Sequence, residues 1–284
     1  MSKKKKLMAI AYDFDGTLAP GNMPEHSFIP EVGIKKPRRF WDEAKAYASK
    51  NDMDEILSYM HLMLKKADQN EIAVKKESFL QHGKRIPFFN GVRGWFSRIN
   101  KYASSKGIRL EHYIISSGLR EMIEGTSISK KIEYIFASGF MYNQNNVAVW
   151  PALAINYTTK TQYLFRINKG IKNSHDNGKI NKYMPLDRRR IPFSRIVYIG
   201  DGETDIPCMK LVKQQGGYAV AVYKPNVRKV KKGGSPKTKA LKLIEQERAD
   251  YAVPADYFTG KPLDKLIKAI IDKVAANSRL EDVF

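Results

Sequence analysis

The apolar residues of this chain gather in short runs that end at charged or turn-forming residues. Residues 7–11, 113–115, 196–199 and 218–222 are four such runs. Short runs without polar alternation are typical of strands that are buried on both faces of a parallel sheet. The pattern therefore predicts a buried strand at each of these places.

A helical spacing dominates residues 23–85, where apolar residues recur every three or four positions. The clearest stripes are Phe40, Trp41, Ala44, Tyr47 and Ala48, and then Ile56, Tyr59, Met60, Met63 and Leu64. Stripes of this kind are typical of helices that pack against a core. We therefore expect a mainly helical insertion after the first strand.

The remaining stretches extend the sheet and cover it. Helical spacing also marks residues 92–102, 241–247 and 263–276. Residues 133–142 and 147–157 predict the two strands of a hairpin. Strands that alternate with helices predict an α/β fold with a doubly wound parallel sheet. The expected division is a core of residues 1–22 and 86–284 and a small helical cap of residues 23–85.

The composition is that of an ordinary folded chain of 284 residues, of which 43% are hydrophobic. No run approaches the roughly 20 apolar residues of a membrane-spanning helix. The lysines at 3–6 and the apolar run after them superficially resemble a signal peptide, but that run is short and ends at Asp13. One cysteine excludes an intrachain disulfide. We therefore expect a cytoplasmic protein without a membrane segment.

Two acidic clusters follow two of the predicted strands. Asp13 and Asp15 come after the first strand, and Asp201 and Asp205 come after the strand of residues 196–199. Ligands of open parallel sheets bind beyond the carboxyl ends of the strands. Clustered carboxylates repel one another unless a cation neutralises them, and hard oxygen ligands favour Mg²⁺. An aspartate beside such an ion can attack a phosphoryl group, and a second can protonate the leaving oxygen.

The chain resembles the haloacid dehalogenase (HAD) superfamily at four places, in the expected order. The first motif, Asp-x-Asp-Gly-Thr-Leu, is matched by residues 13–18, and the fourth, Gly-Asp-Gly-x-x-Asp, by residues 200–205. The second motif is a Ser or Thr that closes an apolar strand. Ser116 matches it, in a Ser-Ser-Gly context similar to that of phosphoserine phosphatase-like members. The third is a lysine, for which Lys160 is the candidate and Lys169 the alternative.

The resemblance implies a Rossmann-like core and a role for each matched carboxylate. Asp13 would be the nucleophile and Asp15 the general acid and base. Asp13, Asp15 and Asp201 would hold Mg²⁺, Asp15 through its backbone carbonyl. Asp205 would be a supporting carboxylate, either close to the metal or holding the lysine.

The resemblance also implies that Ser116, Ser117 and Lys160 bind the phosphoryl oxygens. Either serine also fits the N-cap of a helix at residues 119–124. In the cap, a basic segment precedes the first long helix and offers candidate anion contacts. Its residues are Lys35, Lys36, Arg38 and Arg39.

These features predict a Mg²⁺-dependent phosphohydrolase that forms an aspartyl-phosphate on a small phosphorylated metabolite. Family members that displace a halide lack the second aspartate, so Asp15 favours phosphoester hydrolysis. Phosphonate cleavage, which uses a cap lysine, stays open. Phosphoserine is one candidate substrate beside sugar phosphates and nucleotides, and the oligomeric state is open.

The net charge of +21 requires alternatives from other classes. Residues 3–6 and 228–232 are dense basic clusters, which would suit a nucleic-acid-binding protein or a phosphatase of nucleic-acid ends. Few aromatic residues lie near them, so a stacking platform is not evident. A non-catalytic HAD-fold binding protein is the other alternative. The retention of Asp13, Asp15 and Asp201 favours an enzyme.

Overall fold

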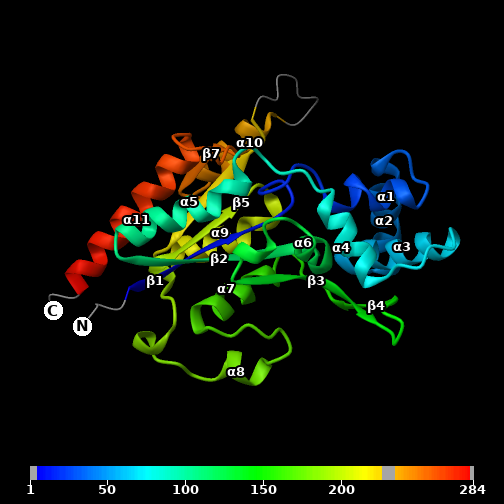
Figure 1. The fold of residues 1–284 in the computed structure, drawn as a ribbon, viewed down its shortest axis with the longest axis horizontal. Coiled ribbons are helices and arrows are strands. Elements are labelled where there is room, and N and C mark those ends of the chain that lie inside the picture. The colour runs from blue at the N-terminus through cyan, green and yellow to red at the C-terminus, as the bar shows by residue number, and fades with distance from the viewer. Residues whose placement is uncertain (1–4, 226–233, 282–284) are drawn as a thin grey trace.

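The computed structural model describes residues 5–225 and 234–281 and confirms the predicted α/β fold (Figure 1). Its seven-stranded sheet has the order β4-β3-β2-β1-β5-β6-β7. The strands are β1 Lys6–Tyr12, β2 Ile108–Leu119, β3 Tyr134–Tyr142, β4 Ala148–Leu153, β5 Ile196–Gly200, β6 Tyr218–Tyr223 and β7 Tyr251–Pro254. Every neighbouring pair is parallel except β3 and β4. The chain winds outward from β1 in both directions, so the topological switch point lies between β1 and β5.

Long helices cover both faces of the sheet. One face carries α5 (Val92–Ser105) and α11 (Pro262–Glu281), and the other carries α7 (Lys160–Lys169), α9 (Ile206–Gln214) and α10 (Pro236–Glu245). The buried residues of β1 alternate between the two hydrophobic clusters because successive strand residues point to opposite faces. This two-sided burial explains why the central strands are apolar without interruption.

Short segments connect these elements. They are α6 Arg120–Glu124, α8 Asn177–Asn181, η2 Ser129–Lys131, η3 Leu186–Arg188, η4 Phe193–Arg195 and η5 Glu203–Asp205. Two predicted strand ends were wrong: β2 continues past residue 115 to Leu119, and β4 stops at Leu153. Among the helices of residues 5–225 and 234–281, none is both long and apolar enough to cross a membrane.

The predicted insertion consists mainly of helices and lies at one end of the sheet, on the right in Figure 1. Its segments are η1 Met23–His26, α1 Phe28–Glu31, α2 Pro37–Asn51, α3 Glu55–Gln69 and α4 Lys76–Lys84. Buried side chains of these helices belong to the same hydrophobic cluster as the α5 face of the sheet. The insertion therefore shares a core with the sheet, and its status as a separate domain stays a prediction.

The predicted hairpin is present as β3 and β4, and it contacts the helical insertion. The backbone amide of Lys76 donates to the Asn146 carbonyl, and the amide of Ala148 donates to the Val74 carbonyl. The rings of Phe79 and Phe140 stack with centroids 5.5 Å apart. The hairpin thus supports the start of α4.

A buried chain of hydrogen bonds joins β1, β2 and α5. The Trp95 Nε1 donates to the Tyr12 hydroxyl at 2.8 Å, which lies 3.0 Å from His112 Nδ1. His112 Nε2 lies 2.9 Å from Asn100 Oδ1. Because an amide oxygen only accepts, His112 carries its proton on Nε2. Burial lowers the pKa of His112 to about 3, so the ring is neutral at pH 7.

We expect acid to destabilise the fold through His112. The unfolded chain takes up this proton near pH 6.5, whereas the folded chain does so only near pH 3. Within this window each unit fall in pH removes about 1.4 kcal/mol of unfolding free energy. Between pH 7 and pH 5, wild type should lose about 2 kcal/mol more than the His112→Gln variant in urea unfolding. Equal losses in both proteins would contradict the assignment.

Candidate active site

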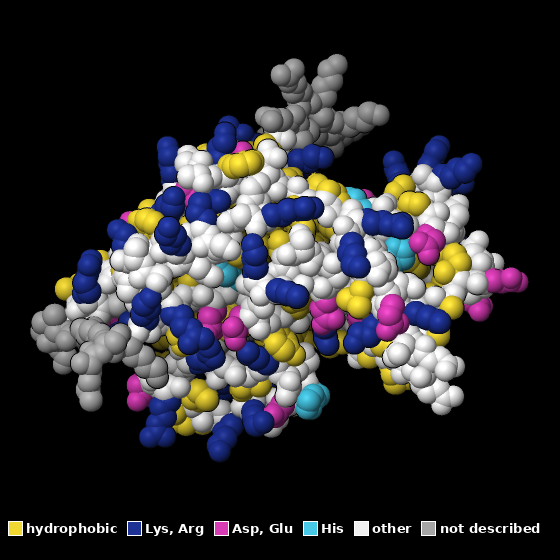
Figure 2. All heavy atoms as spheres, viewed as in Figure 1, with side chains coloured by type: hydrophobic (Ala, Val, Ile, Leu, Met, Phe, Trp, Pro, Cys, Tyr) yellow, Lys and Arg dark blue, Asp and Glu magenta, His cyan; other side chains and the backbone are white. Residues whose placement is uncertain are grey.

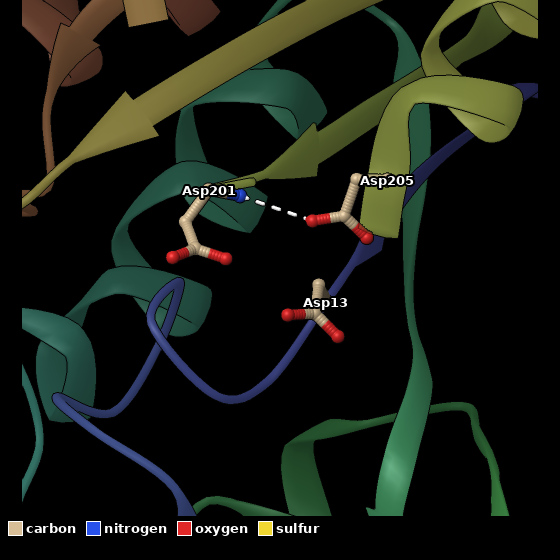
Figure 3. Close-up of side chains that lie close together, drawn as sticks. All are labelled: Asp13, Asp201 and Asp205. Carbon is tan, nitrogen blue, oxygen red and sulfur yellow. Dashed lines mark hydrogen bonds between the residues drawn. The ribbon is translucent and has the colours of Figure 1, made fainter. Parts of the chain in front are cut away.

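The two acidic clusters meet at the carboxyl ends of β1 and β5. Tyr12 pairs with Ile199 in the sheet, so the segments that follow these residues start side by side. Carboxylate oxygens of Asp13, Asp201 and Asp205 lie within 4.8 Å of one another, as Figure 3 shows. The fold thus gathers three negative charges at the switch point of the sheet.

Gly16 allows the two clusters to approach. Its φ of +79° lies in the left-handed region, where residues with a side chain are strained. A Cβ at this position would lie only 2.1 Å from an oxygen of Asp201. Any larger residue would therefore push the first acidic turn away from the second.

Lys160 is the cation that bridges the cluster. Its Nζ lies 2.8 Å from Asp13 Oδ1 and 2.8 Å from Asp205 Oδ1, and its side chain is buried. Lys160 is the first residue of α7, whereas Lys169 is the last. The Nζ of Lys169 donates instead to the carbonyls of Ile180 and Lys182. Only the first of the two candidate lysines reaches the carboxylates.

Asp205 holds Lys160 in place. Besides the lysine, its Oδ1 accepts from the Tyr198 hydroxyl at 2.6 Å, and its Oδ2 accepts from the Asp201 amide at 3.1 Å (Figure 3). With three donors on two oxygens, Asp205 is committed to protein contacts. The Asp201 side chain is exposed and points toward the cluster.

Asp15 lies apart from the three clustered carboxylates. Its Oδ1 accepts a hydrogen bond of 3.0 Å from the backbone amide of Met23. Burial and the nearby charge of Asp13 raise the pKa of Asp15 well above its usual range. A raised pKa favours the protonated form of a carboxyl group, which is the form that serves as a general acid.

The donor set fits a divalent metal ion. Burial raises the pKa of Asp13 to about 6, and the charge of Asp205 adds to this although Lys160 opposes it. One lysine does not neutralise several carboxylates, so a hard cation held by oxygen ligands would restore their charged forms. The residues present therefore fit Mg²⁺.

The two serines lie beside this cluster, at the end of β2. The N-cap of α6 is Leu119, without a side-chain capping bond, so the N-cap interpretation of either serine was wrong. The Ser116 Oγ accepts from the Gly118 amide at 3.0 Å instead. Among the described residues, the buried Ser117 Oγ has no hydrogen-bond partner. An unsatisfied hydroxyl of this kind is available to a ligand.

A cavity of about 1260 Å³ opens above these residues. It is lined by Asp13, Asp15, Ser116, Ser117, Lys160 and Asp201, and on the cap side by Trp41, Ala44, Lys45, Ile56 and Tyr59. The Tyr59 hydroxyl donates to the Ser117 carbonyl at 2.6 Å, which ties the cap to the end of β2. The predicted anion contacts of the segment 35–39 do not line this cavity, so that prediction was wrong.

Several residues of the site were not found from the sequence. Tyr198 and Met23 act through contacts with Asp205 and Asp15, and neither belongs to a motif. Trp41 and Tyr59 were interpreted as core, but they also form the cavity wall.

The model of the haloacid dehalogenase-like hydrolases matches residues 10–210. The chain therefore belongs to this hydrolase family, as its motifs predicted.

Individual relatives extend the comparison over nearly the whole chain. An uncharacterised protein of Borreliella burgdorferi strain B31 is 27% identical over 96% of this chain and 99% of its own length. A probable phosphoserine phosphatase from Vibrio cholerae has a TM-score of 0.57 at 13% identity, over 96% of this chain and 67% of that chain. A phosphoserine phosphatase with a phospho-aspartyl intermediate analogue has a TM-score of 0.52 at 17% identity, over 93% and 99%. At these identities the solved structures show a common fold.

Proposed function

We propose that this protein is a Mg²⁺-dependent phosphatase that hydrolyses a small phosphomonoester through an aspartyl-phosphate. The observation that carries the proposal is the contact of Lys160 with Asp13 at the floor of the cavity. A buried lysine on one oxygen of a carboxylate fixes its orientation and screens the charge of an approaching phosphate. The fold shared with a phosphoserine phosphatase that holds a phospho-aspartyl analogue supports the same chemistry.

The reaction needs two steps on the chain's own groups. A carboxylate oxygen of Asp13 attacks phosphorus, and the bond to the leaving oxygen breaks while Asp15 gives its proton to that oxygen. Asp15 then takes a proton from a water molecule that attacks the aspartyl-phosphate. Inorganic phosphate leaves, and Asp13 is regenerated. Ser116, Ser117 and Lys160 would bind the phosphoryl oxygens in both steps.

The carboxylates of Asp13 and Asp201 and the backbone carbonyl of Asp15 would hold Mg²⁺. When bound, the ion neutralises negative charge around the phosphoryl group. Asp205 would contribute indirectly, because its oxygens already bind Lys160, Tyr198 and the Asp201 amide.

A phosphatase of nucleic-acid ends is the second candidate, because of the net charge of +21. Figure 2 shows Lys and Arg side chains spread over one face, without gathering in a single stripe. The basic cluster 228–232 lies outside the described residues, as do Lys3 and Lys4 of the cluster 3–6. A small metabolite therefore remains the first choice.

Chelation is expected to abolish phosphate release. With para-nitrophenyl phosphate and a panel of phosphorylated metabolites, removal of Mg²⁺ should lower turnover by about a hundredfold or more. Mg²⁺ alone should also raise the melting temperature of wild type, but not that of Asp201→Asn, which lacks one metal ligand. Release that is unaffected by chelator, together with equal melting shifts in the two proteins, would refute the metal site.

A further inference from the structure

The cavity has a second charged region, separate from the carboxylates that carry the proposed chemistry. Outside the catalytic group its charged lining residues are Glu55 and five cations, Lys45, Lys224, Lys239, Lys242 and Arg248. Four of these cations come from the core: Lys224, Lys239, Lys242 and Arg248. We call these four residues the basic wall.

Two consecutive parts of the fold build the basic wall. Lys224 directly follows β6, and Lys239 and Lys242 stand three residues apart on α10, where residues at this spacing share a helix face. Arg248 lies just after the end of α10. Figure 1 shows α10 at the top of the core and the helical cap at the right, so this wall lies apart from the cap.

The lysines of the basic wall have no acidic partner in the part of the chain that the structure describes. Within residues 5–225 and 234–281, no carboxylate forms an ion pair with Lys224, Lys239 or Lys242, whose side chains are exposed. The first turn of α10 also lines the cavity through Pro236, and a helix N-terminus adds partial positive charge. Like charges that share one wall attract anions from solution.

The size of the cavity also favours a ligand that reaches the basic wall. Sites for small ligands usually measure about 300–1000 Å³. At about 1260 Å³, this cavity exceeds what a three-carbon phosphomonoester would fill. A substrate that filled it would extend from Asp13 toward α10 and would meet positive charge there.

We propose that the basic wall is a subsite for a second anionic group, so that the substrate is a small metabolite with two anionic ends. One end is the phosphomonoester that is hydrolysed, and the other is a phosphate or a carboxylate bound by Lys224, Lys239, Lys242 and Arg248. This inference rests on the proposed phosphatase function and narrows its substrate class.

Matched substrates distinguish the two sources of the second charge. Fructose 1,6-bisphosphate is compared with fructose 6-phosphate, and 6-phosphogluconate with glucose 6-phosphate, at low and high salt. A higher kcat/KM for either doubly anionic member, lost at high salt, supports the subsite and identifies its anion. Equal values within both pairs would overturn it, as would a preference for a 5′-phosphorylated oligonucleotide over every small substrate.

The double variant Lys239→Gln/Lys242→Gln tests the wall itself. Its ratio of kcat/KM for the doubly to the singly anionic substrate should fall about three- to tenfold, since each exposed ion pair contributes modestly. Lys237→Gln/Lys265→Gln is the matched control, because it removes the same charge from exposed lysines of α10 and α11 that do not line the cavity. An unchanged ratio in the wall variant, or an equal fall in the control, would overturn the proposal.

Binding separates failure of the subsite from failure of the proposed function. Fructose 1,6-bisphosphate and 6-phosphogluconate are titrated into the Asp13→Asn variant by calorimetry, with and without the wall substitutions. Loss of affinity for either on the wall variant supports the subsite even when wild type releases no phosphate. Affinities that do not change between the two proteins would reject the subsite while leaving the phosphatase proposal standing.

Discussion

Replacing Asp13 with Asn is expected to lower phosphate release by about a thousandfold or more, as removal of a nucleophile does in other hydrolases. The fold should persist, because an amide oxygen still accepts the hydrogen bond that Asp13 Oδ1 receives from Lys160. The amide nitrogen, however, is no nucleophile toward phosphorus. Initial rates on the best panel substrate measure the effect, and thermal melting confirms that the variant is folded.

The covalent step gives this variant a second readout. Wild type that is quenched in acid during turnover of a ³²P-labelled substrate should retain label as an acyl phosphate, which hydroxylamine releases. Asp13→Asn should retain none. Asp68→Asn makes the same chemical change at an exposed cap position and should behave as wild type. Label or substantial turnover in the Asp13 variant would assign the nucleophile elsewhere.

Replacing Lys160 with Met should impair both stability and catalysis. Met replaces the side chain of Lys up to Cε but leaves Asp13 and Asp205 facing each other without their shared cation. Breaking a buried ion pair by removing one partner costs about 3–5 kcal/mol of unfolding free energy. Loss of one phosphate-binding donor should also lower kcat/KM by about a hundredfold or more. Urea unfolding and steady-state kinetics, both at fixed Mg²⁺, measure the two effects.

Lys169→Met is the natural comparison, because both lysines stand on α7. Lys169 contacts only carbonyls of residues 180 and 182, so its replacement should loosen that segment and leave kcat/KM close to wild type. A large kinetic loss in the Lys169 variant, with little in the Lys160 variant, would reverse the assignment of the phosphate-site lysine.

The sequence alone predicted the parts of the fold in which a hydrophobic pattern is followed directly by a motif. The central strands are buried on both faces, so their apolar runs are continuous and easily found. The acidic turns follow these strands directly, and strand order alone then places Asp13 next to Asp201. The helical insertion was equally visible from its spacing.

Features that depend on contacts between residues far apart in the sequence could not be predicted from local pattern or motif. β7 is a four-residue edge strand of exposed and half-buried residues that ends at a proline, so its short apolar run, residues 251–253, was not recognised as a strand. Ser117 and Tyr59 meet only because α3 packs over the end of β2. Lys239 and Lys242 look like any other lysines of a basic chain until α10 is placed beside the cavity. The sequence therefore revealed the clustered carboxylates better than the surfaces that line the cavity around them.

The hydrogen bond between Met23 and Asp15 would link the position of the helical insertion to that of the proposed acid. The donor amide belongs to the first residue of the helical insertion, and the Met23 sulfur also contacts the amide of Leu119 after the serine motif. Any outward motion of the insertion that moves Met23 therefore also frees the carboxyl group that would protonate the leaving oxygen. In this open state the protein would bind or release a ligand, but it would not hydrolyse it because Asp15 would be out of position. A phosphoester that prevented the insertion from closing would then dissociate without being hydrolysed. The protein would select its substrate through the ligands that allow Met23 to return to its contact with Asp15.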